Sequence, residues 1–226
     1  MSRSVRRGIF FNLDNTLANS AGPLRGAFDR FAALCGAMPS DGIFAAIGGM
    51  SVPMAVAVLK RCWSLPYRLD ELQRRYVPLI DAAFRDIEPA PGAATTLESA
   101  FRSGWRVGVV TAVSGARCRA WLARTRLAAY VDVVIGGDEV VLGKPEPEPY
   151  RIAVVRSGCP PELSIAVEDS LVGAKSALAA GIRCYAVAAD STAASDWPDG
   201  VRLIERLDDL LPELKRQRSR RSAGRR

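Results

Sequence analysis

The chain has 226 residues, of which 49% are hydrophobic and 24% charged, a balance typical of a globular protein with one sizeable core. It contains no histidine, which excludes Ser-His-Asp and Cys-His catalysis and imidazole zinc sites. The five cysteines are scattered and form no CxxC pair, which argues against a disulfide framework or a thiolate zinc site. Any catalysis must therefore depend on carboxylates, lysine, hydroxyl groups or a hard metal ion.

The charge is concentrated at the C-terminal end. The formal net charge is +7, and residues 215–226 alone contain seven Lys and Arg residues and no acid. We expect this segment to be a disordered basic tail with at most weak, nonspecific contact to nucleic acid or other polyanions. No apolar run is long enough to span a bilayer, and the N-terminus lacks the apolar segment of a signal peptide. The expected location is therefore the cytoplasm, with no membrane partner.

The predicted elements alternate along most of the chain. Residues 8–14 form a short buried strand with a polar end, and residues 22–86 show helical spacing of apolar residues interrupted by Pro and Gly. A Pro-rich hinge at residues 89–92 follows. The remaining pattern predicts helices at 93–103, 115–126, 149–157 and 170–181, and strands at 105–111, 131–135, 164–167 and 182–188.

Alternating strands and helices predict an α/β fold with a doubly wound parallel sheet, in which ligands bind at the carboxyl ends of the strands. Polar residues follow several of the predicted strands, and Lys144 lies on a loop after another. These residues are Asn12, Asp14, Thr111, Glu168 and Asp169. We expect them to converge, with Lys144, on one edge of the sheet.

These segments resemble the motifs of the haloacid dehalogenase superfamily, over about residues 8–190. The first motif, Asp-x-Asp-x-Thr after a strand, corresponds to Asn12-Leu13-Asp14-Asn15-Thr16. The second is Thr111 at a strand end, the third is Gly143-Lys144-Pro145, and the fourth is the acidic pair Glu168-Asp169. The order and context of the four motifs support this resemblance. Within the superfamily, Asp14 favours phosphatases over dehalogenases, because a halide leaves without being protonated. The similarity of residues 14–20 to the phosphoglycolate-phosphatase-like branch favours phosphatases over sugar-phosphate mutases.

The resemblance implies a role for each of these residues. The first-motif position, here Asn12, would hold the nucleophile, and Asp14 would be the general acid and base. Thr111 and Lys144 would hold phosphoryl oxygens. A Mg²⁺ ion would be bound by Asn12, the backbone carbonyl of Asp14 and the carboxylate of Asp169, with Glu168 acting through water. Positioning and charge neutralisation of this kind suit phosphoryl transfer.

Asn12 departs from the family pattern, because a neutral carboxamide is a poor nucleophile and a weaker metal ligand than a carboxylate. Three explanations stay open at this point. The protein is a pseudophosphatase that binds a phosphorylated ligand, or Asp14 activates water directly, or the asparagine reflects a laboratory change or deamidates to aspartate.

The predicted organisation is a Rossmann-like α/β core formed by residues 1–20 and 87–214, a small helical cap formed by residues 21–86, and the basic tail, residues 215–226. The predicted function is Mg²⁺-dependent hydrolysis of small phosphomonoesters, such as phosphoglycolate-like or sugar-phosphate-like metabolites. The alternatives are phosphate-ligand binding without turnover and, less favoured, a sugar-phosphate mutase.

Overall fold

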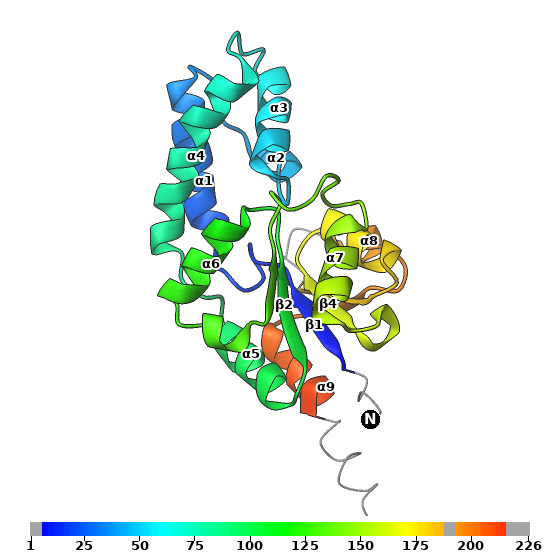
Figure 1. Ribbon diagram of the computed structural model, residues 1–226. Helices are drawn as coiled ribbons and strands as arrows, with labels where there is room; N and C mark the ends of the chain where they lie inside the picture. The colour runs from blue at the N-terminus through cyan, green and yellow to red at the C-terminus, as the bar shows by residue number, and fades with distance from the viewer. Residues whose placement is uncertain (1–5, 188–192, 216–226) are drawn as a thin grey trace, which may run out of the picture.

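A six-stranded parallel sheet forms the centre of the protein (Figure 1). The structure is a computed structural model and describes residues 6–187 and 193–215. The strand order is β3-β2-β1-β4-β5-β6, and every neighbouring pair is parallel. The strands are β1 (Gly8–Phe11), β2 (Arg106–Val110), β3 (Val133–Ile135), β4 (Ile165–Glu168), β5 (Arg183–Val187) and β6 (Arg202–Ile204). The predicted doubly wound α/β fold is confirmed.

Helices cover both faces of this sheet. The helices that follow residue 86 are α5 (Ala93–Arg102), α6 (Gly115–Arg124), α7 (Glu148–Ser157), α8 (Leu171–Ala179) and α9 (Leu211–Lys215). Short 3-10 turns at Ala128–Tyr130, Pro161–Leu163, Ala194–Asp196 and Leu207–Leu210 connect the other elements. Figure 1 shows α5, α6 and α9 on one side of the strands and α7 and α8 on the other.

The central strand β1 explains why the sheet is covered on both sides. Its four residues, Gly-Ile-Phe-Phe, are all buried. Ile9 and Phe11 pack in the apolar cluster beneath α5 and α6, whereas Phe10 packs in a second cluster with Tyr150 of α7 and residues of α8. Because successive side chains of a strand point to opposite faces, a continuous apolar run of this kind fits only a strand buried on both faces.

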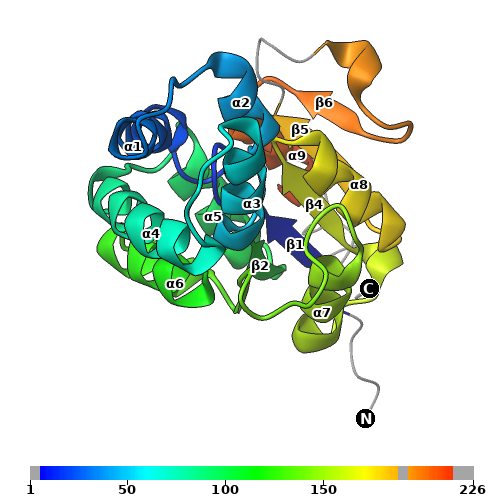
Figure 2. The same ribbon diagram turned by 90° about the horizontal axis from the view of Figure 1, so that it is seen from above.

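The predicted helical insert consists of four helices, α1 (Ala21–Leu34), α2 (Asp41–Ala46), α3 (Val52–Cys62) and α4 (Leu69–Asp86). They pack on one another through aromatic residues, including Phe31 and Tyr76, whose ring centroids are 4.5 Å apart. Figure 2 shows α2 and α3 above the point where β1 ends. We refer to residues 21–86 as the insert. That it behaves as a separate cap domain remains a prediction.

The C-terminal part of the sheet was not predicted from the sequence. Strand β6, at the sheet edge, is three residues long and largely exposed, so it has no alternating apolar pattern to reveal it. Leu207, Leu210 and Leu214 are buried and secure the last turn and helix against α5. The predicted basic tail, apart from Lys215, lies outside the described residues.

Candidate active site

The polar residues predicted at the sheet edge follow adjacent strands. Asn12 follows β1, and its backbone N–H donates to the carbonyl of Val167 in β4 at 2.8 Å. Asp169 follows β4, and Thr111 follows β2. Strands β2, β1 and β4 are neighbours in the sheet, so their carboxyl ends bring these three residues to one place.

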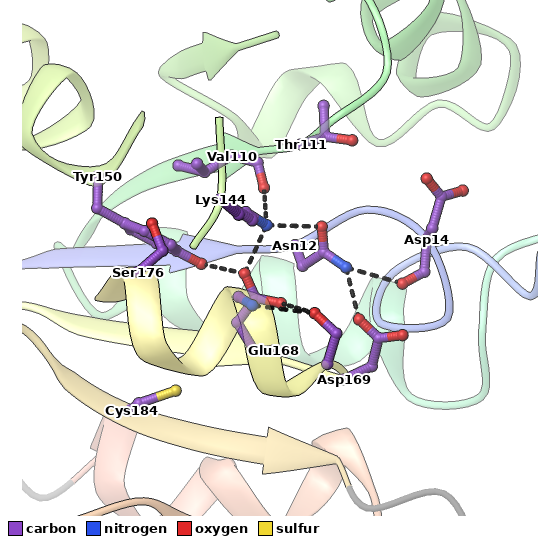
Figure 3. Close-up of polar contacts among 12 residues, drawn as sticks. Asn12, Asp14, Val110, Thr111, Lys144, Tyr150, Glu168, Asp169, Ser176 and Cys184 are labelled. Atoms are coloured by element: carbon purple, nitrogen blue, oxygen red, sulfur yellow. Dashed lines mark hydrogen bonds and ion pairs between the residues drawn. The ribbon is translucent and has the colours of Figure 1, made fainter. Parts of the chain in front are cut away.

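The carboxamide of Asn12 is central to the site (Figure 3). Its nitrogen Nδ2 donates to the backbone oxygen of Asp14 at 2.9 Å and to Oδ1 of Asp169 at 2.7 Å. Its oxygen Oδ1 accepts from Nζ of Lys144 at 3.1 Å. A lysine ammonium has only donors, so the amide oxygen must face Lys144 and the nitrogen must face the two acceptors. This network fixes the orientation of the amide.

Lys144 connects Asn12 to a buried acidic group. Besides Asn12, its ammonium donates to the backbone oxygen of Val110 at 3.0 Å and to Oε1 of Glu168 at 2.5 Å. The Lys144 and Glu168 side chains are 4% and 0% exposed. A buried ion pair of this kind is tolerated because each charge is compensated by the other and by further hydrogen bonds.

Tyr150 is a member of this network that the sequence did not reveal. Its hydroxyl donates to Oε1 of Glu168 at 2.5 Å, and its side chain is fully buried. Burial, followed by the charge of Glu168, raises the pKa of the Tyr150 phenol well above its usual value, so it remains a donor. Its place in the Pro-Glu-Pro-Tyr segment after Lys144 was the available signal, but a tyrosine there is equally typical of a packed helix.

Gly173 explains how Glu168 can be accommodated. A Cβ atom at Gly173 would lie 2.0 Å from Oε2 of Glu168, so only glycine lets the first turn of α8 approach this carboxylate. The N-cap of the same helix is Ser170, whose hydroxyl accepts from the Gly173 backbone N–H at 3.1 Å. The start of α8 is thus shaped around Glu168.

Asp14 and Thr111 lie beside this network. In Figure 3 the hydroxyl of Thr111 and the carboxyl group of Asp14 lie on the side of Asn12 away from Glu168. The Thr111 hydroxyl accepts from the Val113 backbone N–H at 3.2 Å. Oδ1 of Asp14 is shielded from solvent and has no hydrogen-bond partner within the described part of the chain. An unpartnered buried carboxylate oxygen is costly, so this atom is poised to bind a ligand or to carry a proton.

Burial raises the pKa of both aspartates at the site. For Asp14 the desolvation is offset in part by the Ser20 hydroxyl and by the charges of Lys144 and Arg117. For Asp169, desolvation and then the charge of Glu168 raise the pKa to about 7, against the lowering effect of Lys144. A carboxyl group with a pKa near neutrality can exchange a proton at physiological pH.

The oxygen atoms at the sheet edge match in part the Mg²⁺ site that the family resemblance implies. The backbone oxygen of Asp14 and Oδ1 of Asp169 converge, because both accept from the single nitrogen of Asn12. Oxygens of this type suit Mg²⁺. The third ligand, Oδ1 of Asn12, faces Lys144 and would have to turn toward the ion. Within residues 6–187 and 193–215, no cluster of three or more Asp, Glu, Cys or His side chains is arranged for a metal. The site thus offers two oxygens in place and a neutral third ligand.

A cavity of about 280 Å³ opens beside Thr111 and Lys144. On one side it is bounded by the start of α3 and the preceding loop, at Gly49, Ser51, Pro53 and Met54. On the other side it is bounded by loops of the core. These core residues are Thr111, Ala112, Gly137, Val140, Val141, Gly143, Lys144 and Pro149. A ligand in this cavity would be enclosed between the insert and the sheet edge.

Comparison with known protein families identifies this arrangement. The model of the haloacid dehalogenase-like hydrolases matches residues 9–187, from β1 to the end of β5. The chain belongs to this family. The match includes all six residues predicted for the site, and it confirms the resemblance noted from the four motifs.

Individual members of the family are similar over much of the chain. A phosphoglycolate phosphatase of Cereibacter sphaeroides is 32% identical over 181 residues, which cover 78% of this chain and 82% of that protein. The protein CbbY of the same species is 34% identical over 140 residues, 60% of each chain. This chain therefore matches less than two thirds of the length of that relative.

A solved structure provides a further comparison. CbbY from Rhodobacter sphaeroides in complex with phosphate has a TM-score of 0.79 and 26% sequence identity, covering 91% of this chain and 96% of the other. A second structure of that protein, an aspartate-to-asparagine mutant, is in complex with xylulose-(1,5)-bisphosphate. Among the residues that the structure describes here, no helix is both long and apolar enough to cross a membrane.

Proposed function

We propose that this member of the haloacid dehalogenase-like hydrolases is a phosphatase that takes small phosphomonoesters at the sheet edge. The observation that carries the proposal is the contact of Lys144 Nζ with Asn12 Oδ1 at 3.1 Å, between Thr111 and Asp169. A cation and a hydroxyl beside an acidic pair suit the positioning and charge neutralisation that phosphoryl transfer requires. Relatives named as phosphatases and a related structure containing phosphate support this function.

Each residue has a separate role in the proposal. Lys144 and Thr111 would hold the phosphoryl oxygens, and Glu168 would keep Lys144 in position. Asp14 would protonate the leaving oxygen and then accept a proton from water. Its unpartnered, buried oxygen Oδ1 and its raised pKa suit a group that exchanges a proton during the reaction.

Mg²⁺ is the proposed cofactor, held by the backbone oxygen of Asp14, the carboxylate of Asp169 and, after rotation of its amide, the oxygen of Asn12. When bound, it would neutralise charge on the phosphoryl group. Glu168 is less suited to this role than Asp169, because its carboxylate already accepts from Lys144 and Tyr150. We expect weaker Mg²⁺ binding than in a chain with aspartate at position 12, because the neutral amide removes one negative charge from the site.

Asn12 determines how fast the site can turn over. An amide oxygen that is hydrogen-bonded to Lys144 is a poor nucleophile, so a covalent aspartyl-phosphate route would be lost. If Asp14 activates water directly, slow hydrolysis would remain. The second candidate function is therefore binding of a phosphorylated ligand without turnover, and it is favoured by the same fixed amide.

Hydrolysis of p-nitrophenyl phosphate with Mg²⁺, measured for the native chain and for Asn12→Asp, tests the proposal. We expect the variant to be faster by two or more orders of magnitude, as is typical when a nucleophile is restored. Intact-mass measurement before each assay excludes deamidation of Asn12 as the source of activity. If neither protein hydrolyses the ester or binds inorganic phosphate, the phosphatase assignment is wrong. Turnover by the variant alone would assign the native chain to ligand binding.

Three predictions from the sequence remain predictions. The mutase alternative is less favoured, because the chain has no histidine to assist in the insert. Polyanion binding by the basic tail concerns residues outside the described part, and it is tested by deleting residues 215–226. The cytoplasmic location also remains to be tested.

A further inference from the structure

We infer that this cavity selects phosphomonoesters whose alcohol part is small and uncharged, and that it discriminates against ligands with a second anionic group. The inference rests on the proposed function and specifies its substrate class. It follows from the size, the charge and the chemistry of the walls between the insert and the sheet edge.

The size of the cavity limits the ligand. Its volume of about 280 Å³ is just below the range for pockets that bind small molecules, about 300–1,000 Å³. In the proposed function, the phosphoryl group occupies the part of the cavity beside Lys144 and Thr111. The remaining space accommodates an alcohol of a few carbon atoms, bounded by Ser51 and Met54 of the insert.

The charge of the walls limits the ligand further. Lys144 is the one charged side chain among the twelve residues that form the cavity. The three N–H groups of its ammonium already have acceptors in Glu168, Asn12 and the Val110 carbonyl, so it can serve at most one phosphoryl group, in exchange for one of these acceptors. Other parts of the lining, at Pro53 and Met54 of the insert and Val140 of the core, offer apolar surface. A second anion enclosed there would be desolvated without a counter-charge, which is strongly unfavourable.

Three cations of the insert have partners within the insert itself. Arg25 pairs with Asp29 and Asp41, and Lys60 donates to the backbone oxygens of Leu65 and Tyr67. Arg75 pairs with Glu71 and stacks on Tyr67, with its guanidinium carbon 4.2 Å from the ring centroid. These interactions use the charges for packing within the insert.

Arg117, in α6, is the described cation that most closely competes with this inference. Its charge lowers the pKa of Asp14, so it acts on the site electrostatically. Its guanidinium, however, makes hydrogen bonds of 2.6 and 2.8 Å to Oδ1 of Asp81 in α4 and lies over the ring of Phe84. A second anionic group would have to break this pairing to reach Arg117.

The expected preference differs from the ligands that the names of the relatives indicate. Phosphoglycolate has a carboxylate in addition to its phosphate, and xylulose-1,5-bisphosphate has a second phosphate. One relative is named as a phosphoglycolate phosphatase, and the structure of another, CbbY, contains xylulose-(1,5)-bisphosphate. The absence of a second cation in this cavity would direct the present chain to neutral alcohols instead.

The inference is tested by titrating phosphate esters into the full chain in a calorimeter, in the presence of Mg²⁺ and at fixed ionic strength. Ethyl phosphate and phosphoglycolate form a matched pair, because they differ by replacement of a methyl group with a carboxylate. We expect ethyl phosphate to bind roughly ten-fold or more tightly than phosphoglycolate, because the carboxylate would be left unpaired. Inorganic phosphate, titrated in parallel, tests the phosphate site itself.

A gain of function gives an independent measurement. Met54→Arg places a cation on the cavity wall, and Met38→Arg places one on an exposed loop residue of the insert outside the cavity. We expect the first variant to raise the ratio of phosphoglycolate affinity to ethyl phosphate affinity roughly ten-fold over that of the native chain, and the second to leave this ratio unchanged.

These outcomes distinguish failure of the inference from failure of the proposed function. Binding of inorganic phosphate together with equal or tighter binding of phosphoglycolate would overturn the inference and leave the proposed function intact. An equal gain from both arginine variants would also overturn it, because a nonspecific charge effect would then explain the result. Failure of every ligand to bind, phosphate included, would overturn both.

Discussion

The nitrogen of the Asn12 side chain donates to Oδ1 of Asp169 at 2.7 Å, across 157 positions of the chain. The same nitrogen donates to the backbone oxygen of Asp14. A partly positive NH₂ group thus lies between the backbone oxygen of Asp14 and the carboxylate of Asp169. An aspartate at position 12 would place a carboxylate oxygen there instead. Asparagine stabilises this cluster without a metal ion, whereas aspartate would face Asp169 unless a metal ion lay between them.

The first prediction concerns the stability of Asn12→Asp. Without Mg²⁺, the new carboxylate would face Asp169 and the Asp14 carbonyl, and we expect a loss of about 1–3 kcal/mol in the free energy of unfolding. With millimolar Mg²⁺ the variant should recover most of this loss, because an ion bound only by the folded state stabilises it. Urea unfolding with EDTA or Mg²⁺ measures both. An unchanged stability in EDTA would contradict the predicted repulsion.

The second prediction concerns Tyr150→Phe. The substitution removes the hydroxyl that donates to the buried carboxylate of Glu168, and we expect a loss of about 1.5–3 kcal/mol, the range for hydrogen bonds to charged groups. Urea unfolding measures the change. The control is Tyr130→Phe, since the Tyr130 ring packs edge-on against Phe101 near the surface and its loss of a hydroxyl should cost about 0.5 kcal/mol or less. Equal effects would show that Tyr150 contributes only packing.

A third prediction follows from the space at Gly173. Gly173→Ala places a methyl group where the Glu168 carboxylate lies, and we expect a loss of about 1–3 kcal/mol or more together with weaker phosphate binding, because Lys144 depends on Glu168. Gly26→Ala is the matched control. Gly26 lies within α1, where an added Cβ meets nothing within 4 Å, so alanine should raise stability by about 0.5–1 kcal/mol. Opposite signs in the two variants are the decisive result.

The fourth prediction is a pH dependence that originates at Asp169. Its folded-state pKa of about 7 lies above the ordinary value of 3.8, so the folded state binds the proton more tightly than the unfolded state. The resulting stability is fully present below about pH 4 and is lost as the pH rises through about 7.

Asp169→Asn should remove this dependence, because an amide stays neutral and its oxygen can still accept from Asn12. In EDTA, as the pH rises from 4 to 8, we expect the variant to gain roughly 4 kcal/mol in the free energy of unfolding relative to the native chain. Chemical unfolding across this range measures it. Asp196→Asn, at an exposed position, is the control and should follow the native profile. If the stability of both variants followed the same pH profile as the native chain, the pH dependence could not originate at Asp169.

The fold and the composition of the site could be predicted from local sequence. The apolar run of β1, the Gly-Lys-Pro segment and the acidic pair after β4 each have a short-range signature, and parallel strands bring their carboxyl ends to one edge. The identities of Asn12, Lys144 and Asp169 were therefore sufficient to predict that these residues meet. The convergence at 3.1 and 2.7 Å agrees with that expectation.

Other features depend on contacts between distant segments and have no local signature. The function of Tyr150 as a donor and of Gly173 as the space for a carboxylate is visible only once α7 and α8 pack around Glu168. The direction of the Asn12 amide is decided by the single fact that Lys144 offers donors and Asp14 and Asp169 offer acceptors. The neutral wall at Met54 exists because the insert folds back over the sheet edge. Sequence periodicity determines the elements, whereas hydrogen-bond partners and cavity walls are set by packing between them.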